Sequence, residues 1–400
     1  MSKTIKLVSI ITLFFFISIS HSQEKFTISG TISDIKSNET LIGVDVLIND
    51  LKTGTTTNEY GFYSITLPKG IYQISISYLG FTEIIEDVDL NANTKRNFKL
   101  SEDGLQLNEI IVLDKPNKLN IQKAEMSVNK LSISTIKQIP AVLGEVDVIK
   151  AILTLPGVTN AGEGQSGFNV RGGASDQNLI LLDEATIYNS SHLFGFFSVF
   201  NTDAIKDLKL YKGGIPARYG GRVSSVLDIY QKEGNSNDFK LTGGIGLVSS
   251  RLLAEGPIEK GKSSFLIGGR ASYAHLFLPL FNNENKAYFY DLNSKINYRF
   301  NDQNNLFLST YFGKDVFGIS DNFVNKYGNS VVNLRWNHLY SDKLFSNLSI
   351  IYSDYFYGLI LDFVGFEWDS GITNFNLKYD FKHYINNDFK LSYGISSIYS

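Results

Sequence analysis

The stretch that decides the fold is DLKLYKGGIPARYGGR, residues 207–222. It begins with apolar residues that alternate with charged ones, which predicts a strand. Two glycine pairs follow, at 213–214 and 220–221, and such pairs mark tight turns. Residues 223–230 predict a second strand. The stretch therefore predicts two strands joined by a glycine-rich loop.

The region around this stretch, residues 120–232, mixes helix and strand signals. Apolar residues at helical spacing from Val146 to Leu153 predict a helix, which Pro156-Gly157 ends. Further strands are predicted at 168–173 and 179–182, with glycine-rich turns between them. The region is therefore predicted to be an α+β unit.

Three segments of this unit follow the order, spacing and residue types of a known family. They are Asn169–Gly173, Leu179–Asp183 and Asp207–Arg222, and they resemble the plug domain of TonB-dependent outer-membrane receptors. The resemblance implies that residues 120–232 close the lumen of a β-barrel. The plug motif of this sequence consists of Arg171, Gly172, Gly173, Asp183, Gly213, Gly214, Arg218, Tyr219, Gly220 and Gly221.

Three arginines of this region, Arg171, Arg218 and Arg222, are expected to brace the plug. A charged lumen wall would give each guanidinium group a carboxylate partner. The alternative is that the arginines form a basic binding site for an acidic ligand.

The last part of the chain, residues 233–400, has the pattern of membrane-facing strands. Of the 29 Phe, 22 Tyr and 2 Trp residues, 33 lie after residue 238. Aromatic and apolar residues alternate with amide and charged ones over long runs, as from Phe375 to Phe381, and short turns alternate with longer loops. Both features are typical of outer-membrane barrels. We predict eight antiparallel strands here.

An eight-stranded barrel is filled by its own side chains and cannot hold a plug, whereas a barrel of about twenty-two strands can. The receptor family that the plug resembles has the larger barrel. We therefore expect about 8 of 22 strands in this chain, and a longer gene product. The expected fold class is mainly β: a small β-sandwich, then an α+β plug, then a partial antiparallel transmembrane β-barrel.

Residues 23–100 predict the small β-sandwich. Short period-two runs recur there, separated by Gly, Pro and Asn. Three segments, Ile42–Val46, Thr57–Tyr63 and Pro68–Tyr72, resemble the carboxypeptidase regulatory-like domain. In that family the domain is a non-catalytic β-sandwich.

Residues 1–22 have the three parts of a secretory signal peptide. Two lysines precede an apolar run from Leu7 to Ile19, and Ser20-His21-Ser22 gives a small-x-small cleavage site. The run is too short for a helix that spans a bilayer, which needs about 20 residues. We expect export to the outer membrane of a Gram-negative bacterium, with the regulatory-like domain in the periplasm.

Residues 101–119 connect the sandwich to the plug and contain a short apolar run. By resemblance, this run lies at the position of the family's TonB box, where an extended segment adds a strand to a partner's sheet edge. The box would consist of Leu107, Asn108, Glu109, Ile110, Ile111, Val112 and Leu113. The alternative is a last edge strand of the sandwich.

The sequence offers little for catalysis or metal binding. It has no cysteine, which excludes disulfides and thiolate sites. Glycines at 162, 164 and 167 match the letters of a dinucleotide fingerprint but lack its strand and helix. The histidines after residue 22 lack metal-ligand spacing, and Asp183-Glu184 is expected to make structural hydrogen bonds. We predict no enzyme, no cofactor and no metal, and the net charge of −3 argues against a nucleic-acid partner.

Together these parts predict a TonB-dependent receptor that imports a scarce nutrient: a siderophore, vitamin, glycan or peptide. The resemblance implies as partners TonB of the inner-membrane TonB–ExbB–ExbD complex, outer-membrane lipids and the nutrient, and leaves a surface lipoprotein open. The alternative is a plugged barrel with a passive, adhesive or signalling role.

One plug segment, residues 188–197, mixes polar and aromatic side chains as ligand-binding surfaces do. It is predicted to form an outward tip where Tyr188, Asn189, His192 and Phe194 face the ligand. The alternative is that its aromatic residues pack against the barrel wall.

Overall fold

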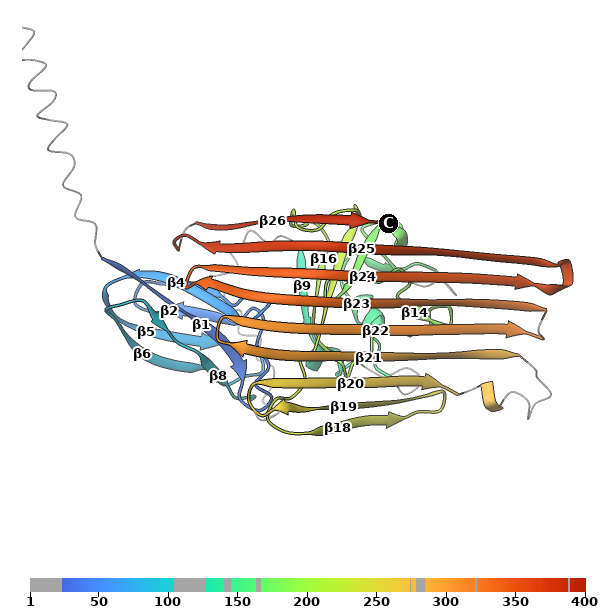
Figure 1. Cartoon of the computed structure of the whole chain (residues 1–400), viewed down its shortest axis with the longest axis horizontal. Helices are drawn as coiled ribbons and strands as arrows, with labels where there is room; N and C mark the ends of the chain where they lie inside the picture. The colour runs from blue at the N-terminus through green and yellow to red at the C-terminus, as the bar shows by residue number, and fades with distance from the viewer. Residues whose placement is uncertain are drawn as a thin grey trace, which may run out of the picture.

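The computed structural model describes residues 24–103, 127–139, 145–162, 167–273, 275–277, 285–320, 322–387 and 389–400. The predicted signal peptide and the predicted TonB box lie outside the described residues. The fold is mainly β, as predicted. Figure 1 shows a small sandwich beside one end of a long sheet, and a separate α+β unit against one face of that sheet.

The N-terminal unit is a β-sandwich of two four-stranded sheets. Strands β4, β1 and β7, with β8 beside β1, form one sheet, and the order β3-β2-β5-β6 forms the other. Buried apolar side chains from both sheets, such as Ile28, Val46 and Ile74, fill the space between them. The strands are β1 (Lys25–Asp34), β2 (Asp45–Ile48), β3 (Thr53–Thr56), β4 (Phe62–Pro68), β5 (Gly70–Ser77), β6 (Ile84–Leu90), β7 (Thr94–Lys95) and β8 (Phe98–Leu100).

The α+β unit is built on a five-stranded mixed sheet in the order β13-β12-β17-β16-β9. The stretch that opened the sequence analysis supplies β16, which pairs antiparallel with β17. Every residue of β17 is buried, as its central place requires. The strands are β9 (Val128–Ser132), β12 (Asn178–Leu182), β13 (Ala185–Thr186), β16 (Ile205–Tyr211) and β17 (Ser225–Gln231).

Short elements complete this unit. The helix predicted around 146–153 is α3 (Val148–Ile152), and the Asp147 side chain caps it by accepting a hydrogen bond from the Lys150 amide. A second helix, α2, spans Ile133–Ile136. Two small hairpins are β10 (Val158–Asn160) with β11 (Phe168–Val170), and β14 (Ser191–His192) with β15 (Phe197–Ser198).

The long sheet has nine antiparallel strands in chain order, one more than the eight predicted. The sequence reading missed the turn at 246–248 that separates β18 from β19. Strands β18 and β26 are the two edges, so the sheet is open. The strands are β18 (Lys240–Ile245), β19 (Ser249–Glu259), β20 (Ser263–Ser272), β21 (Lys286–Asn301), β22 (Asn304–Ile319), β23 (Phe323–Ser341), β24 (Leu344–Leu361), β25 (Phe366–Tyr384) and β26 (Lys390–Tyr399).

The two faces of the long sheet differ in chemistry. Along β21, Asp291, Asn293 and Lys295 are buried, while Leu292 and Ile296 between them are exposed. This alternation places polar side chains against the α+β unit and apolar ones outward, as in an outer-membrane barrel wall. Among the described residues, no helix is both long and apolar enough to cross a membrane.

The sandwich lies at the end of the long sheet where β19 joins β20, β21 joins β22, β23 joins β24 and β25 joins β26 (Figure 1). Ser29 donates a hydrogen bond to Asp342 in the β23–β24 turn, 2.9 Å between oxygens. The Thr66 amide donates to Asn387 in the β25–β26 turn at 2.9 Å. The sandwich is therefore in contact with the sheet and does not hang free of it.

Candidate functional site

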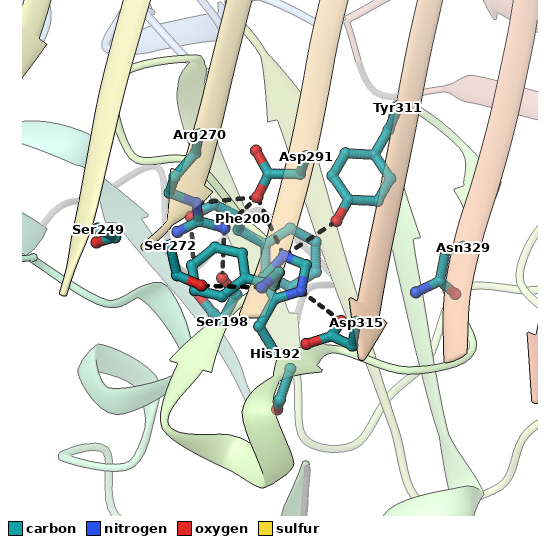
Figure 2. Close-up of polar contacts among 12 residues, drawn as sticks. His192, Ser198, Phe200, Ser249, Arg270, Ser272, Asp291, Tyr311, Asp315 and Asn329 are labelled. Carbon is teal, nitrogen blue, oxygen red and sulfur yellow. Dashed lines mark hydrogen bonds and ion pairs between the residues drawn. The ribbon is translucent and has the colours of Figure 1, made fainter. Parts of the chain in front are cut away.

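The candidate site is the buried polar interface between the α+β unit and the inner face of the long sheet. Figure 2 shows its central part, where His192 lies between Asp291 and Asp315. His192 comes from the short strand β14, whereas the two aspartates come from β21 and β22. Side chains far apart in the sequence are thus brought together by the packing of the α+β unit against the long sheet.

His192 is bonded on both ring nitrogens. Nδ1 lies 2.7 Å from Asp315 Oδ2, and Nε2 lies 3.0 Å from Asp291 Oδ2. The Leu193 amide donates to the other oxygen of Asp315 at 2.8 Å. The ring stacks on Phe289, with centroids 4.3 Å apart. A buried imidazole held this way is fixed in position and orientation.

Arg270, on β20, joins this cluster to two parts of the α+β unit. Its Nη2 lies 2.6 Å from Asp291 Oδ2 and donates to the Ser198 carbonyl at 2.7 Å. Its Nη1 lies 3.0 Å from Glu145 Oε2. The side chain of Arg270 is only 3% exposed. The guanidinium group therefore bridges a carboxylate of the long sheet, the predicted wall, and a carboxylate and a carbonyl of the α+β unit, the predicted plug. Figure 2 shows the contacts with Asp291 and Ser198.

The pKa of His192 makes one contact of this interface sensitive to pH. Burial alone would lower that pKa, but the carboxylates of Asp315 and Asp291 outweigh burial, so the pKa is raised above its ordinary value. The imidazolium form is therefore the one that stabilises the interface. Its contribution is fully present below about pH 6.5, the ordinary histidine pKa, and is lost as the pH rises through the raised pKa.

We expect His192→Gln to reduce hydrogen-exchange protection of residues 191–200 at low pH and to have a shrinking effect as the pH rises. The measurement is exchange from about pH 6 to about pH 9, corrected for the intrinsic rate. His383→Gln, outside this cluster, is the control. A difference between wild type and His192→Gln that stays constant or grows with pH would contradict the assignment.

Asp183, a predicted motif residue, is fully buried at a second point of the interface. Its carboxylate lies 2.8 Å from Lys295 Nζ and accepts hydrogen bonds from the Ser309 hydroxyl at 2.7 Å and the Gln231 amide at 3.1 Å. Its carbonyl accepts from the Asn333 side chain at 2.5 Å. Burial alone would raise the pKa of Asp183, but the charges of Lys295 and Arg335, together with the hydrogen bonds from Lys295 and Ser309, outweigh burial and hold the pKa below its usual range. The carboxylate is thus charged and paired with the wall.

Glu184 follows Asp183 and contacts both the wall and the sandwich. It accepts hydrogen bonds from Ser349 at 2.8 Å, Asn347 at 2.9 Å and the hydroxyl of Tyr60 at 2.7 Å. Both residues of the turn have positive φ, 47° at Asp183 and 73° at Glu184. The predicted structural hydrogen bonds of Asp183-Glu184 are therefore present, and they hold a strained turn.

The predicted arginine braces have different partners from those expected. Arg218 pairs with Glu59 of the sandwich at 2.8 Å, not with a carboxylate of the lumen wall. Arg171 donates to the Ser127 hydroxyl at 2.9 Å, and Arg222 donates to the Gly221 carbonyl at 3.0 Å. Within the described ranges, neither Arg171 nor Arg222 has a carboxylate partner. For Arg218 the expected wall partner was wrong, because sequence periodicity does not show that the sandwich lies against the plug. For Arg171 and Arg222 a carboxylate partner on the wall stays a prediction.

The remaining motif residues shape the loops around these contacts. Tyr219 donates to Asp228 at 2.6 Å, and the Arg218 guanidinium lies over its ring. Gly173 faces Ser224 so closely that an added Cβ would lie 2.3 Å from its Oγ. Positive φ is found at Gly172, Gly214 and Gly221, which suits glycine, and Gly213 and Gly220 complete the two turns.

The predicted ligand-facing tip packs against the sheet. His192 is buried as described above, and Phe194 packs edge-on against Phe317, with centroids 5.1 Å apart. Tyr188 contacts Tyr355 and is hydrogen bonded to Asn374. The Asn189 amide donates to the side-chain oxygen of Asn329 at 3.3 Å, and the side-chain nitrogen of Asn329 donates to the Asn189 carbonyl at 2.8 Å. The aromatic residues of this segment therefore pack against the sheet, which was the alternative prediction for it. Contact of the segment with a ligand stays a prediction.

Sequence reasoning missed the wall residues that hold the plug. Arg270, Asp291, Lys295 and Asp315 are charged residues on the inner face of otherwise amphipathic strands. The signal that could have found them is the inward register of these charges, since a buried charge requires a partner. In the part of the chain that the structure describes, no group of three or more His, Asp or Glu side chains has an arrangement suited to a metal ion.

Comparison with known proteins identifies the first two units. Residues 28–112 match the model of the CarboxypepD_reg-like domain, and residues 120–225 match that of the TonB-dependent receptor plug domain. The TonB-dependent receptor P3 of Formosa agariphila is 30% identical over 92 residues, which is 23% of this chain and 9% of that protein.

Solved structures show the same fold at low sequence identity. A mutant of the ferric enterobactin receptor PfeA from Pseudomonas aeruginosa has a TM-score of 0.53 and 14% identity, over 69% of this chain and 49% of the receptor. The alcaligin outer-membrane receptor FauA from Bordetella pertussis has a TM-score of 0.52 and 13% identity, over 68% of this chain and 47% of the receptor. The chain thus spans about half the length of these receptors. None of these matches is to an enzyme. The chain carries a CarboxypepD_reg-like domain and the plug domain of the TonB-dependent receptors, followed by an open sheet with the fold of an outer-membrane receptor wall.

Proposed function

We propose that the protein is a TonB-dependent receptor that imports a scarce nutrient across the outer membrane of a Gram-negative bacterium. The observation that carries the proposal is the plug seated on the polar face of a sheet whose other face is apolar. Such a sheet faces lipid on one side and an occupied lumen on the other. The buried contacts of Asp183, His192 and Arg270 keep the lumen occupied.

The connections of the sheet support an orientation of the protein in the membrane. Short turns of outer-membrane barrels lie on the periplasmic side and long loops outside. The sandwich contacts the turns at 259–262, 341–343 and 386–389, so we place it in the periplasm. Residues 107–113, between the sandwich and the plug, would then be within reach of TonB.

The nutrient belongs to one of four classes: siderophore, vitamin, glycan or peptide. The solved neighbours are named for ferric enterobactin and alcaligin, which supports testing iron-loaded siderophores first. The partners are TonB of the TonB–ExbB–ExbD complex, the lipids of the outer membrane and the nutrient.

The test compares energised and de-energised cells. Uptake of labelled candidates is measured in the wild type and in a strain lacking the gene, and the nutrient that depends on the gene is then followed with a protonophore present. We expect the protonophore to abolish accumulation above the external concentration while binding to cells persists. Gene-dependent uptake that survives the protonophore would indicate a passive barrel and contradict the proposal.

A further inference from the structure

The periplasmic sandwich contacts the plug and the wall together, through the turn between β3 and β4. This turn, Asn58–Gly61, extends toward the turn of the plug at Asp183-Glu184. Asn58 shapes it by accepting hydrogen bonds from the amides of Tyr60 and Phe62. These hydrogen bonds fix the shape of the turn, so that it presents the side chains of Glu59 and Tyr60.

Tyr60 makes contacts with three parts of the interface. Its hydroxyl donates to Glu184 of the plug at 2.7 Å. Its ring stacks on Phe345 of β24, with centroids 5.1 Å apart, and the guanidinium of Arg335 on β23 lies 4.9 Å from its centroid. One side chain of the sandwich thus connects the plug to two strands of the wall.

Glu59 is shared among three cations. Arg218 of the plug lies 2.8 Å away and Lys209 of the plug 3.7 Å away, and Lys382 of β25 also pairs with it. Burial alone would raise the pKa of Glu59, but these cations outweigh burial and hold it well below its usual range. If the sandwich left, the three cations would lose this carboxylate, which is costly in a buried site.

A second row of contacts fixes the sandwich near the start of the sheet. Lys206 of the plug lies 3.4 Å from Glu39 of the sandwich and 3.9 Å from Glu233. The Thr40 hydroxyl donates to Glu233 at 2.8 Å. The Ser236 amide donates to the Ser37 carbonyl at 3.0 Å. The sandwich is therefore held to β16 of the plug through Lys206 and Lys209, and to the start of the long sheet through Glu233 and Ser236.

The turn at Asp183-Glu184 is held from two sides by these arrangements. Asp183 is bound by the wall, and Glu184 is bound by the wall and by Tyr60. Residues with positive φ that are not glycine keep that conformation only while their surroundings hold it. Removal of Tyr60 would leave Glu184 with fewer partners and the turn less restrained.

We propose that the docked sandwich restrains the plug in its closed position, and that the plug rearranges only after the sandwich has withdrawn. This rests on the proposed import function, since only an importer needs its plug to move. The sandwich is then a second closure on the periplasmic side, and Glu59 and Tyr60 are the residues through which it acts on the plug.

The first test asks whether the sandwich is docked and whether Tyr60 holds it. The chain has no cysteine, so Ser29→Cys places a single thiol in the buried contact with Asp342. The protein as its gene encodes it is studied in outer-membrane vesicles with a polyethylene glycol maleimide. We expect slow labelling at position 29 and labelling roughly tenfold faster when Tyr60→Phe is added, since a hydrogen bond to a charged group is lost.

Two controls keep this result interpretable. Lys260 lies on an exposed turn at the same end of the sheet, so a cysteine introduced by Lys260→Cys should label rapidly both with and without Tyr60→Phe. Tyr340→Phe also removes a hydroxyl from a hydrogen bond, that with Tyr379, but this exposed hydrogen bond joins two strands of the wall, β23 and β25, and not the sandwich, so Tyr340→Phe should leave labelling at position 29 slow. Labelling at position 29 that is as fast as at position 260 without Tyr60→Phe would overturn the proposal, as would labelling that Tyr60→Phe does not change.

The second test measures the plug itself by hydrogen exchange. We expect Tyr60→Phe to speed exchange of residues 183–187 roughly tenfold, and Tyr340→Phe to leave it unchanged. Unchanged exchange in Tyr60→Phe would overturn the restraint on the plug even if the sandwich docks. Neither test uses a nutrient or TonB, so a failure of the proposed import function would leave both results standing.

Discussion

Asp183→Asn is expected to destabilise the plug by about 3–5 kcal/mol, because removal of one partner leaves a buried charge without compensation. Lys295 would remain at a side-chain exposure of 2% with its carboxylate partner gone. The hydrogen bonds from Ser309 and the Gln231 amide would also meet a neutral group. Asparagine tolerates positive φ, so the backbone conformation at this position does not explain the loss.

The measurement is pulse proteolysis of the plug across a urea series, in the protein as its gene encodes it. Asp176→Asn is the matched control, since Asp176 is an exposed aspartate of the same unit and should leave the midpoint unchanged. If Asp183→Asn shifts the midpoint no more than Asp176→Asn does, the ion pair with Lys295 does not hold the plug.

Arg270→Met is expected to loosen the other side of the plug by about 3–5 kcal/mol. The methionine fills much of the same space, but Asp291 and Glu145 lose their shared cation. The Ser198 carbonyl loses its donor as well. Because two of these three groups belong to the plug, we expect faster hydrogen exchange of residues 191–200 and earlier proteolysis of the plug.

Arg251→Met provides a control that differs mainly in burial. Arg251 also joins the wall to a plug carboxylate, Asp203, at 2.8 Å, but its side chain is 25% exposed. Partly solvated pairs contribute about 1 kcal/mol or less. Equal effects of Arg270→Met and Arg251→Met would show that burial does not set the strength of these bridges.

The strands were predictable where local pattern decides them. The alternation of apolar and polar residues predicted the strands of the wall from β19 onward, because one face of each long strand is apolar and the other is polar. It missed the separate strand β18, whose Gly243-Gly244 pair interrupts the alternation. The glycine-rich loop of the plug was equally local, since Gly172, Gly214 and Gly221 need positive φ.

The partners across the interface were not predictable in the same way. The sequence suggested that Arg218 is a brace but not that Glu59, 159 residues away, is its partner. The sequence suggested that His192 faces a ligand at the surface, whereas His192 is buried and paired with two aspartates of the wall. Such pairs depend on how separate units pack against each other, and a period of two within one strand carries no information about that packing.

The measurement that tests the central claim most directly is deletion of residues 107–113 in the protein as its gene encodes it. Cells that carry the deletion are compared with wild type for binding and for uptake of the nutrient that depends on the gene. We predict normal surface binding and no uptake, because the segment offered to TonB would be gone while the plug and wall remain. Unchanged uptake by the deletion strain would contradict the account.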